Sequence, residues 1–270
     1  MTEHTKKHKQ EHAQEPGAAL TILGAVATIT LNQPAKHNAF DDGIIQALLA
    51  HLDTIRNTDT VRVMLLKAEG KNFCAGADLA WMKRMAGMSY EENQADARQL
   101  ARLMLELNTL PIPTIARVQG AAYGGAIGLI ACCDIAFASD DAKFCLSEVK
   151  LGLAPATIGP FVVDAMGARR CRKLFLTGEV FTAKQAYDFD LIHEVVALDK
   201  LDEAVAAATK AILKTGPCAS KAAKQLIFDI QANGGGIQEK TSQLIAKLRV
   251  SEEGQEGLGA FFEKRSPSWI

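Results

Sequence analysis

Three short segments of the chain combine residue types that could stabilise a negative charge as it develops. Residues 72–79 (NFCAGADL) and 120–128 (GAAYGGAIG) are rich in glycine, and residues 147–149 (SEV) add one carboxylate, Glu148. Turns of this kind offer backbone N–H donors, which stabilise a carbonyl oxygen that becomes negative without reorganising during the reaction. The combination predicts chemistry that passes through an enolate.

The second glycine turn has two readings. Gly124 and Gly125 follow a short β-prone segment, so they could simply allow a helix and a strand to pack closely. However, Gly125 is expected at the N-terminus of a helix, where unpaired N–H groups and the helix dipole attract anions. The chain contains neither GxGxxG nor GxxxxGK[ST], so neither nucleotide-binding fingerprint is present.

Several motifs in the same order resemble the enoyl-CoA hydratase/isomerase family, also called the crotonase superfamily. The resemblance runs from about residue 20 to residue 269. Its most specific parts are residues 73–79 (FCAGADL), 120–125 (GAAYGG), 133–138 (CDIAFA) and 148–155 (EVKLGLAP). Supporting matches are residues 31–34 (LNQP), 38–39 (NA), 175–178 (FLTG) and 260–265 (AFFEKR).

The resemblance implies specific roles for residues at these positions. The backbone N–H groups of Ala77 and Gly125 would form an oxyanion hole for a thioester carbonyl, and Glu148 would be the acid/base catalyst. A carboxylate beside an apolar acyl pocket should have a raised pKa, because burial disfavours its charged form. Residues expected to contact the acyl-CoA substrate are Lys36, Asn38, Ala39, Ala75, Asp78, Leu79, Trp81, Met82, Gly124, Gly128, Phe261 and Lys264.

Lys264 matches a family position that reaches the CoA held by a neighbouring subunit, with Phe261 as its companion. The main chain around Lys36–Ala39 would flank the pantetheine arm. Core packing is the alternative role for Trp81 and Met82.

One departure from the family pattern concerns Gly128. Well-studied hydratases carry a second glutamate eight residues after the opening glycine of the second motif, where this chain has Gly128. Residues 76–85 (GADLAWMKRM) with 89–93 (SYEEN), and residues 127–134 (IGLIACCD), resemble bacterial methylglutaconyl-CoA and isohexenylglutaconyl-CoA hydratases. Those relatives also lack this glutamate, and their acyl groups carry their own carboxylate. We expect the glycine to leave room for that group, with Lys83, Arg84, Arg169 and Arg170 as candidate partners.

Three functions stay open at this point. The first is an enoyl-CoA hydratase that adds water through an enolate-like state, with Glu148 both deprotonating the water and returning a proton to the α-carbon. The second is an enoyl-CoA isomerase, in which Glu148 shifts a proton between the α and γ carbons. The third is a family member without catalysis that serves as a binding or assembly protein, although Glu148 and both glycine turns argue against it.

The elements that must position these residues follow from hydrophobic spacing. Alternating and β-branched residues predict strands at 20–23, 26–31, 61–66, 114–118, 134–139 and 143–146. Apolar residues at helical spacing predict helices at 44–55 and 91–110, and further helices after residue 197. The apolar segment 126–132 is compatible with a buried helix. Alternating β and α elements would also permit a doubly wound sheet.

The resemblance favours a specific α/β fold: a ββα superhelical spiral followed by helices that pack between subunits. We therefore divide the chain into a flexible tail (1–17), a crotonase-like spiral core (18–199) and a C-terminal helical trimerisation region (200–270). The protein is expected to be a homo-oligomer, a trimer or a hexamer.

Composition excludes several partners. Thirty basic and thirty-one acidic residues give a net charge of −1, so no broad basic field predicts a nucleic acid or a membrane as partner. Six cysteines without CxxC pairs favour buried reduced thiols, and six histidines without HExxH spacing indicate no metal. The first seventeen residues resemble neither a secretory signal nor a transit peptide, so we expect a cytoplasmic protein. No cofactor is expected, because coenzyme A is part of the substrate.

Overall fold

The main sheet of the molecule is mixed and mostly parallel. The computed structural model describes residues 10–11, 17–233 and 236–270. Within them, seven strands form this sheet in the order β1-β2-β3-β4-β5-β7-β10. Their bounds are β1 (Gln10–Glu11), β2 (Ala18–Leu23), β3 (Val26–Leu31), β4 (Val63–Ala68), β5 (Thr114–Val118), β7 (Ile135–Ser139) and β10 (Glu194–Val196).

The sheet begins as a hairpin and continues as parallel strands. β2 and β3 pair antiparallel, and Gly24 occupies the turn with φ 58°. From β3 through β4, β5 and β7 to β10 every pairing is parallel. Parallel strands are covered on both faces, which explains why four of the five residues of β5 are buried.

A second, smaller sheet carries the chain through the glycine-rich segments. In the described residues it contains three strands in the order β6-β8-β9: β6 (Ala121–Tyr123), β8 (Lys143–Cys145) and β9 (Val180–Thr182). Successive turns of the chain thus supply strands to both sheets, as expected for the spiral. The prediction for residues 120–125 was incomplete, because a strand lies inside the expected turn.

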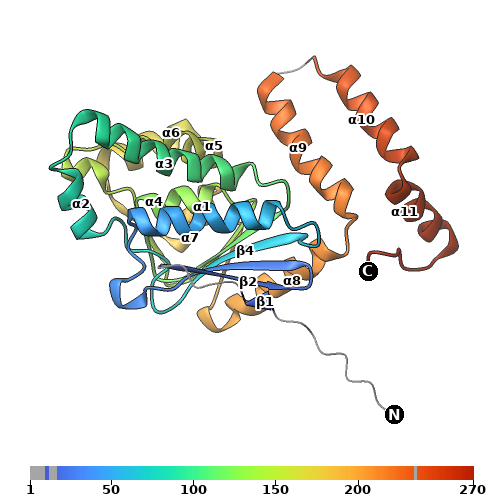
Figure 1. The fold of residues 1–270 in the computed structure, drawn as a ribbon, viewed down its shortest axis with the longest axis horizontal. Helices are drawn as coiled ribbons and strands as arrows, with labels where there is room; N and C mark the ends of the chain where they lie inside the picture. The colour runs from blue at the N-terminus through green and yellow to red at the C-terminus, as the bar shows by residue number, and fades with distance from the viewer. Residues whose placement is uncertain (1–9, 12–16, 234–235) are drawn as a thin grey trace, which may run out of the picture.

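Helices α1 (Asp42–Arg56), α3 (Tyr90–Asn108) and α4 (Gly125–Ala131) lie on one side of the main sheet (Figure 1). Their ends follow local sequence. Asp41 caps α1 by accepting a hydrogen bond from the Ile44 N–H, and Ser89 with Glu92 forms a capping box at the start of α3. Helices α1 and α3 were predicted from hydrophobic spacing, and α4 matches the apolar segment compatible with a buried helix, all with bounds shifted by one or two residues.

The remaining elements around the core are short. They are η1 (Pro34–Lys36), α2 (Leu79–Met85), η2 (Glu148–Leu151), α5 (Gly159–Met166), α6 (Ala168–Thr177), α7 (Ala183–Asp188) and η3 (Leu198–Lys200), where η marks a 3₁₀-helix. Two of them, α2 and η2, begin directly at residues of the predicted site. Helices of this length bury too few apolar residues to show a clear period in the sequence.

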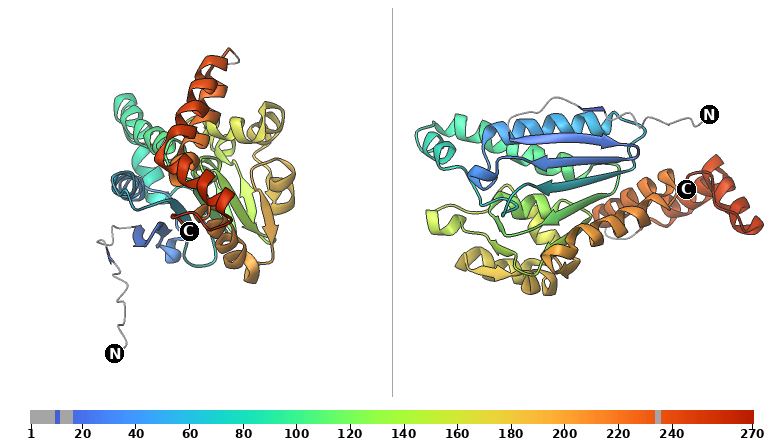
Figure 2. Two further views of the ribbon diagram at one scale, coloured as in Figure 1. Left: turned by 90° about the vertical axis from the view of Figure 1, so that its right-hand side faces the viewer. Right: turned by 90° about the horizontal axis from the view of Figure 1, so that it is seen from below.

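The C-terminal helices divide differently from the sequence prediction. Helix α8 (Leu201–Leu213) packs on the sheet, with Leu201 and Val205 buried against Val63 and Ile115. Only α9 (Pro217–Asn233), α10 (Gln238–Val250) and α11 (Glu252–Glu263) extend away from the core (Figure 1, Figure 2). The boundary expected near residue 200 therefore lies after α8.

One buried ion pair anchors the extended helices to the core. The Nζ of Lys224, on α9, donates to the Asp134 carboxylate (2.8 Å) and to the Ile112 carbonyl (3.2 Å). The same carboxylate oxygen accepts hydrogen bonds from the Thr114 N–H and hydroxyl. Lys224 is 8% exposed, so its charge depends on these partners.

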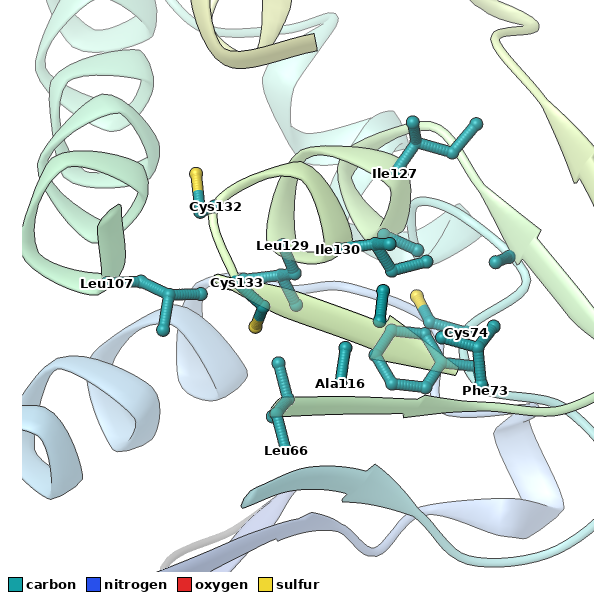
Figure 3. Close-up of a cluster of buried hydrophobic side chains, with 14 of the residues drawn as sticks. Leu66, Phe73, Cys74, Leu107, Ala116, Ile127, Leu129, Ile130, Cys132 and Cys133 are labelled. Carbon is teal, nitrogen blue, oxygen red and sulfur yellow. The ribbon is translucent and has the colours of Figure 1, made fainter. Parts of the chain in front are cut away.

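The hydrophobic core lies between the helices and the main sheet and extends beneath the glycine-rich segments. Figure 3 shows Phe73 and Cys74 packed near Ala116 of β5 and below Ile127 and Ile130 of α4. Phe73, Ile127 and Leu129 are fully buried. The backbone of both glycine turns is therefore supported from below by close-packed side chains.

Two other expectations can be compared with the described residues. Gln10–Glu11, inside the predicted flexible tail, pair with β2 as strand β1, whereas residues 1–9 and 12–16 lie outside the described residues. All six cysteines are free, as predicted, but Cys218 is exposed. In the described part of the chain, no helix combines the length and apolar character needed to span a membrane.

Candidate active site

The site is built on one extended segment, residues 72–78, which lies between two others. On one side, the Ala75 N–H donates to the His37 carbonyl, the Phe40 N–H to Gly76 and the Asp78 N–H to Phe40. On the other, the Phe73 N–H donates to Gln119, and Cys74 exchanges bonds with Ala121 and Tyr123. These backbone bonds fix the three glycine-rich and polar segments side by side.

Two backbone donors in this arrangement are unused. In the bridge between Ala77 and Phe40, the bonds run through Gly76 and Asp78, so the Ala77 N–H makes none. Gly125 is the first residue of α4, where an N–H has no partner within the helix. Among the described residues neither N–H donates a hydrogen bond, and a Cβ built on Gly125 would meet nothing within 4 Å.

Glu148 lies beside the second of these donors. The Gly124 N–H donates to the Cys145 carbonyl (2.9 Å), which brings the end of β8 next to the glycine turn. Three residues later Glu148 opens η2, and its Oε1 lies 3.4 Å from the position of a Cβ built on Gly124. The carboxylate therefore faces the turn that presents the Gly125 N–H.

The Glu148 carboxylate is poorly solvated. Its Oε2 is buried and has no hydrogen-bond partner in the described part of the chain. Burial raises the pKa of the Glu148 carboxyl above its ordinary value of 4.5, which confirms the direction expected from the sequence. A partly desolvated carboxylate with one unpartnered oxygen, beside the glycine turn that presents a free N–H donor, can exchange protons with an enolisable carbonyl compound.

Gly128 does not provide the room that we expected. A Cβ built there would lie 2.4 Å from Cγ2 and 2.8 Å from Cβ of Ile158, and 3.0 Å from Sδ of Met104. Both neighbours are buried, at 1% and 0% exposure. The expectation of space for a substrate carboxylate at Gly128 is wrong, because Ile158 and Met104 fill it. Residues this distant in sequence gave no signal of that contact.

The segment around Lys36–Ala39 borders the extended segment 72–78. Asn38 is fully buried, and its amide donates to the carbonyls of Glu69 and Asn72. Asn38 therefore holds the loop together rather than offering polar atoms to a ligand. Lys36 is exposed, and its Nζ lies 3.8 Å from the Asp78 carboxylate, with which it forms an ion pair.

Asp78 and its neighbours connect the first glycine segment to α2. The Asp78 carboxylate accepts hydrogen bonds from the N–H groups of Ala80 and Trp81, and these bonds lower its pKa. It caps a helix, which accounts for its residue type. Leu79 is 81% exposed, and Ala39 and Ala75 are half-buried.

Trp81 and Met82 differ in their surroundings. Trp81 is 5% exposed, belongs to the main hydrophobic cluster and donates from its indole N–H to Asp96 (3.3 Å). This places Trp81 in the core, the alternative weighed from the sequence. Met82 is half-buried.

The candidate cations for a substrate carboxylate lie on the surface. Arg84 pairs with Asp42 at 2.6 Å, and Arg170 pairs with Asp190. Lys83 and Arg169 are exposed. None of the four is buried, so the structure does not place them as partners for a buried carboxylate.

Phe261 and Lys264 lie at the end of α11, on the extended helices and away from the core of their own chain (Figure 2). Phe261 is 76% exposed, and Lys264 ends the helix with φ 56°.

Comparison with known proteins places the chain among acyl thioester enzymes. A model of the enoyl-CoA hydratase/isomerase family matches residues 21–270. The crystal structure of an enoyl-CoA hydratase from Shewanella pealeana is 48% identical, with a TM-score of 0.91, and the match covers 95% of this chain and 97% of that one.

Two curated relatives carry different reaction names. The trans-2-decenoyl-[acyl-carrier-protein] isomerase of Streptococcus mutans is 30% identical over 92% of this chain and 95% of its own length. The 2,3-dehydroadipyl-CoA hydratase of Escherichia coli is 31% identical over 90% and 94%. With its spiral of two sheets, its paired free donors and a family match over almost its whole length, the chain belongs to the enoyl-CoA hydratase/isomerase family.

Proposed function

We propose that the protein is an enoyl-CoA hydratase with a single catalytic carboxylate. The observation that carries this proposal is the buried, unpartnered Oε2 of Glu148, whose carboxylate lies beside the glycine turn with the free Gly125 N–H. The relatives named as hydratases support hydration as the reaction.

The proposed reaction uses these groups in two steps. The N–H groups of Ala77 and Gly125 bind the thioester oxygen and stabilise the charge that it gains. Glu148 removes a proton from water as the water oxygen bonds to the β-carbon. Protonated Glu148 then returns that proton to the α-carbon, which completes the addition of one water and restores the carboxylate.

The test is to incubate the protein with crotonyl-CoA and follow both the loss of the conjugated double bond and the mass of the product. A gain of one water is expected. The variant Glu148→Gln should lose turnover by about a hundredfold or more, the usual effect of removing a general acid–base group, while still binding CoA. Activity near wild type in this variant would remove Glu148 from the mechanism.

An enoyl-CoA isomerase is the second candidate, and the packing at Gly128 favours it specifically. Ile158 and Met104 place an apolar wall where a second acid would stand. Shifting a proton between the α and γ carbons needs one carboxylate and no bound water, and a 30% identical relative is named as an isomerase. Unchanged product mass with a moved double bond would identify this reaction. No turnover over a range of enoyl thioesters would instead support a binding protein without catalysis.

For the acyl group, we propose a substrate that carries its own carboxylate, such as methylglutaconyl-CoA. The resemblance of residues 76–85 and 127–134 to glutaconyl-type hydratases supports this, as does the relative named for 2,3-dehydroadipyl-CoA, itself a dicarboxylic thioester. The test compares kcat/KM for methylglutaconyl-CoA and crotonyl-CoA under one condition. A higher value for crotonyl-CoA would reject the glutaconyl proposal and leave the hydratase proposal intact.

We also propose that the active form is a trimer or a hexamer. Helices α9–α11 expose large apolar side chains, which a monomer would leave in water: Ile227, Ile230, Ile245, Val250, Phe261 and Phe262. Sedimentation should show trimers or hexamers, and Lys264→Ala should weaken CoA binding without changing assembly. A monomer at working concentration, or unchanged CoA affinity in Lys264→Ala, would contradict the proposal.

A further inference from the structure

Asn72 lies where the three segments of the site meet and bonds to all of them. Its side-chain Oδ1 accepts a hydrogen bond from the Ala121 N–H at 3.0 Å. Its Nδ2 lies 3.1 Å from His37 Nδ1, and its main-chain carbonyl accepts from the Asn38 amide at 2.9 Å. One residue thus links the loop at 36–39, the strand that leads to Ala77 and the strand that leads to Gly125.

We propose that Asn72 is a positioning residue that sets the relation between the two oxyanion-hole donors; this rests on the proposed function. From Asn72 the chain runs directly to the Ala77 N–H, and from Ala121 strand β6 runs directly to Gly124 and Gly125. The hydrogen bond between Asn72 Oδ1 and Ala121 N joins the two segments where each begins. A shift at this bond changes the distance between the N–H groups of Ala77 and Gly125.

The packing beside Asn72 allows little adjustment elsewhere. Gly120 has φ 60°, and a Cβ built there would lie 2.1 Å from the Lys71 carbonyl and 2.7 Å from Asn72 Oδ1. The segments that contain Asn72 and Gly120 therefore lie in contact at this point. Their backbone bonds, from Phe73 to Gln119 and from Cys74 to Ala121, do not involve the Asn72 side chain.

The fold should therefore survive loss of the Asn72 side chain, whereas the relative position of the Ala77 and Gly125 N–H groups should change. Without Oδ1, the partly buried Ala121 N–H loses its acceptor, and β6 must shift to find water or another partner. Displacements of about 1 Å in a reacting geometry can lower turnover by about a hundredfold. Stabilisation of an enolate should suffer more than binding of the CoA portion.

The experiment uses acetoacetyl-CoA, an enolisable thioester whose enolate absorbs in the near ultraviolet. Binding to wild type should lower the apparent pKa of its enolisation, because the two N–H donors stabilise the enolate. In Asn72→Ala most of this lowering should be lost, and kcat for hydration should fall on the order of 10- to 100-fold, with KM changed much less. Thermal unfolding checks that the variant is folded.

A matched control separates positioning from general destabilisation. Asn57→Ala removes an exposed asparagine that bonds within the end of α1, away from the site. This variant should keep the enolate shift. If Asn72→Ala does not fold, Asn72→Ser carries the same test, because its hydroxyl is too short to reach the Ala121 N–H.

The outcomes distinguish failure of the proposed function from failure of the proposed role of Asn72. A wild-type protein that does not lower the pKa of bound acetoacetyl-CoA would contradict the proposed function itself. A wild-type protein that does so, with a folded Asn72→Ala or Asn72→Ser variant that does so equally, would overturn the role of Asn72 alone. Equal losses in Asn57→Ala and Asn72→Ala would also overturn it, because the loss would then not be specific to the bond with Ala121.

Discussion

Glu148 lies directly beside Gly124, in the turn that opens α4. A Cβ built on Gly124 would lie 3.4 Å from Oε1 of Glu148, and Gly124 itself has φ 56° and ψ −123°. That backbone conformation is nearly closed to residues with a Cβ. Glycine is therefore needed at this position for the path of the chain, and any side chain there would pack directly against the carboxylate.

We expect Gly124→Ala to lose activity and about 1–3 kcal/mol of stability, the usual cost of a strained backbone conformation. Gly24→Ala is the matched control, because Gly24 also has positive φ but a Cβ there meets nothing within 4 Å. This control should lose stability and keep kcat. Turnover and thermal unfolding of both variants decide the matter: equal turnover in the two would show that Gly124 is not needed beside Glu148.

The raised pKa of Glu148 predicts a pH-dependent stability. The folded state holds a proton on this carboxyl at pH values where the unfolded chain has lost it, so wild-type stability falls as pH rises from about 4.5 through the raised pKa. Glu148→Gln removes this loss. The variant should be more stable than wild type at neutral pH, and the difference should shrink towards zero below pH 4.5.

Urea unfolding of both proteins from pH 4 to pH 8 measures this difference. A constant difference over the whole range would mean that burial does not perturb Glu148. The same ionisation governs activity, because the carboxylate form must remove the proton from water. kcat/KM for hydration should therefore fall as pH drops through the raised pKa.

The contact between Gly128 and Ile158 predicts strong coupling between two substitutions. Gly128→Ala overpacks the site and should cost about 1–3 kcal/mol. Ile158→Ala removes the Cγ2 that lies 2.4 Å from the new Cβ, but alone it leaves a cavity and costs about 2–5 kcal/mol. The double variant should lose clearly less than the sum of the two. Additive losses in a double-mutant cycle would show that the two residues are not in contact.

The ion pair between Lys224 and Asp134 should matter far more than those on the surface. Lys224→Met leaves a partly buried carboxylate with fewer donors, and we expect a loss approaching about 3 kcal/mol. Arg84→Met is the control, because Arg84 and Asp42 are both more than half exposed, and its loss should be below about 1 kcal/mol. Similar losses in the two variants would contradict the anchoring role of Lys224.

Sequence patterns predicted the main elements because those elements are long or strongly periodic. Leu103, Met104 and Leu107 are buried on α3 at helical spacing, and β3 and β5 match the predicted ranges. Short elements were harder. Strand β6 comprises only three residues inside a glycine-rich segment. Its position depends on its pairing with Cys74 and Phe144 rather than on its own composition.

The sequence indicated which residues belong to the candidate site but not which side chains pack around them. Glu148 and the two glycine turns could be identified because their motifs occur in a fixed order along the chain. Ile158 lies thirty positions from Gly128, and nothing in the spacing indicates that its side chain fills the space beside it. Asn72 was overlooked for a different reason. Asparagines next to glycine turns often bond to the main chain, and that local signal could have drawn attention to it.

In the proposed mechanism the groups that stabilise negative charge are main-chain atoms, and this affects how the protein could diverge. The N–H groups at positions 77 and 125 depend on the path of the backbone, so many side-chain replacements nearby leave them in place. The proton carrier, in contrast, is a single side chain. A descendant could therefore acquire a different reaction by replacing or moving one acid while it inherits the means of binding an enolate unchanged.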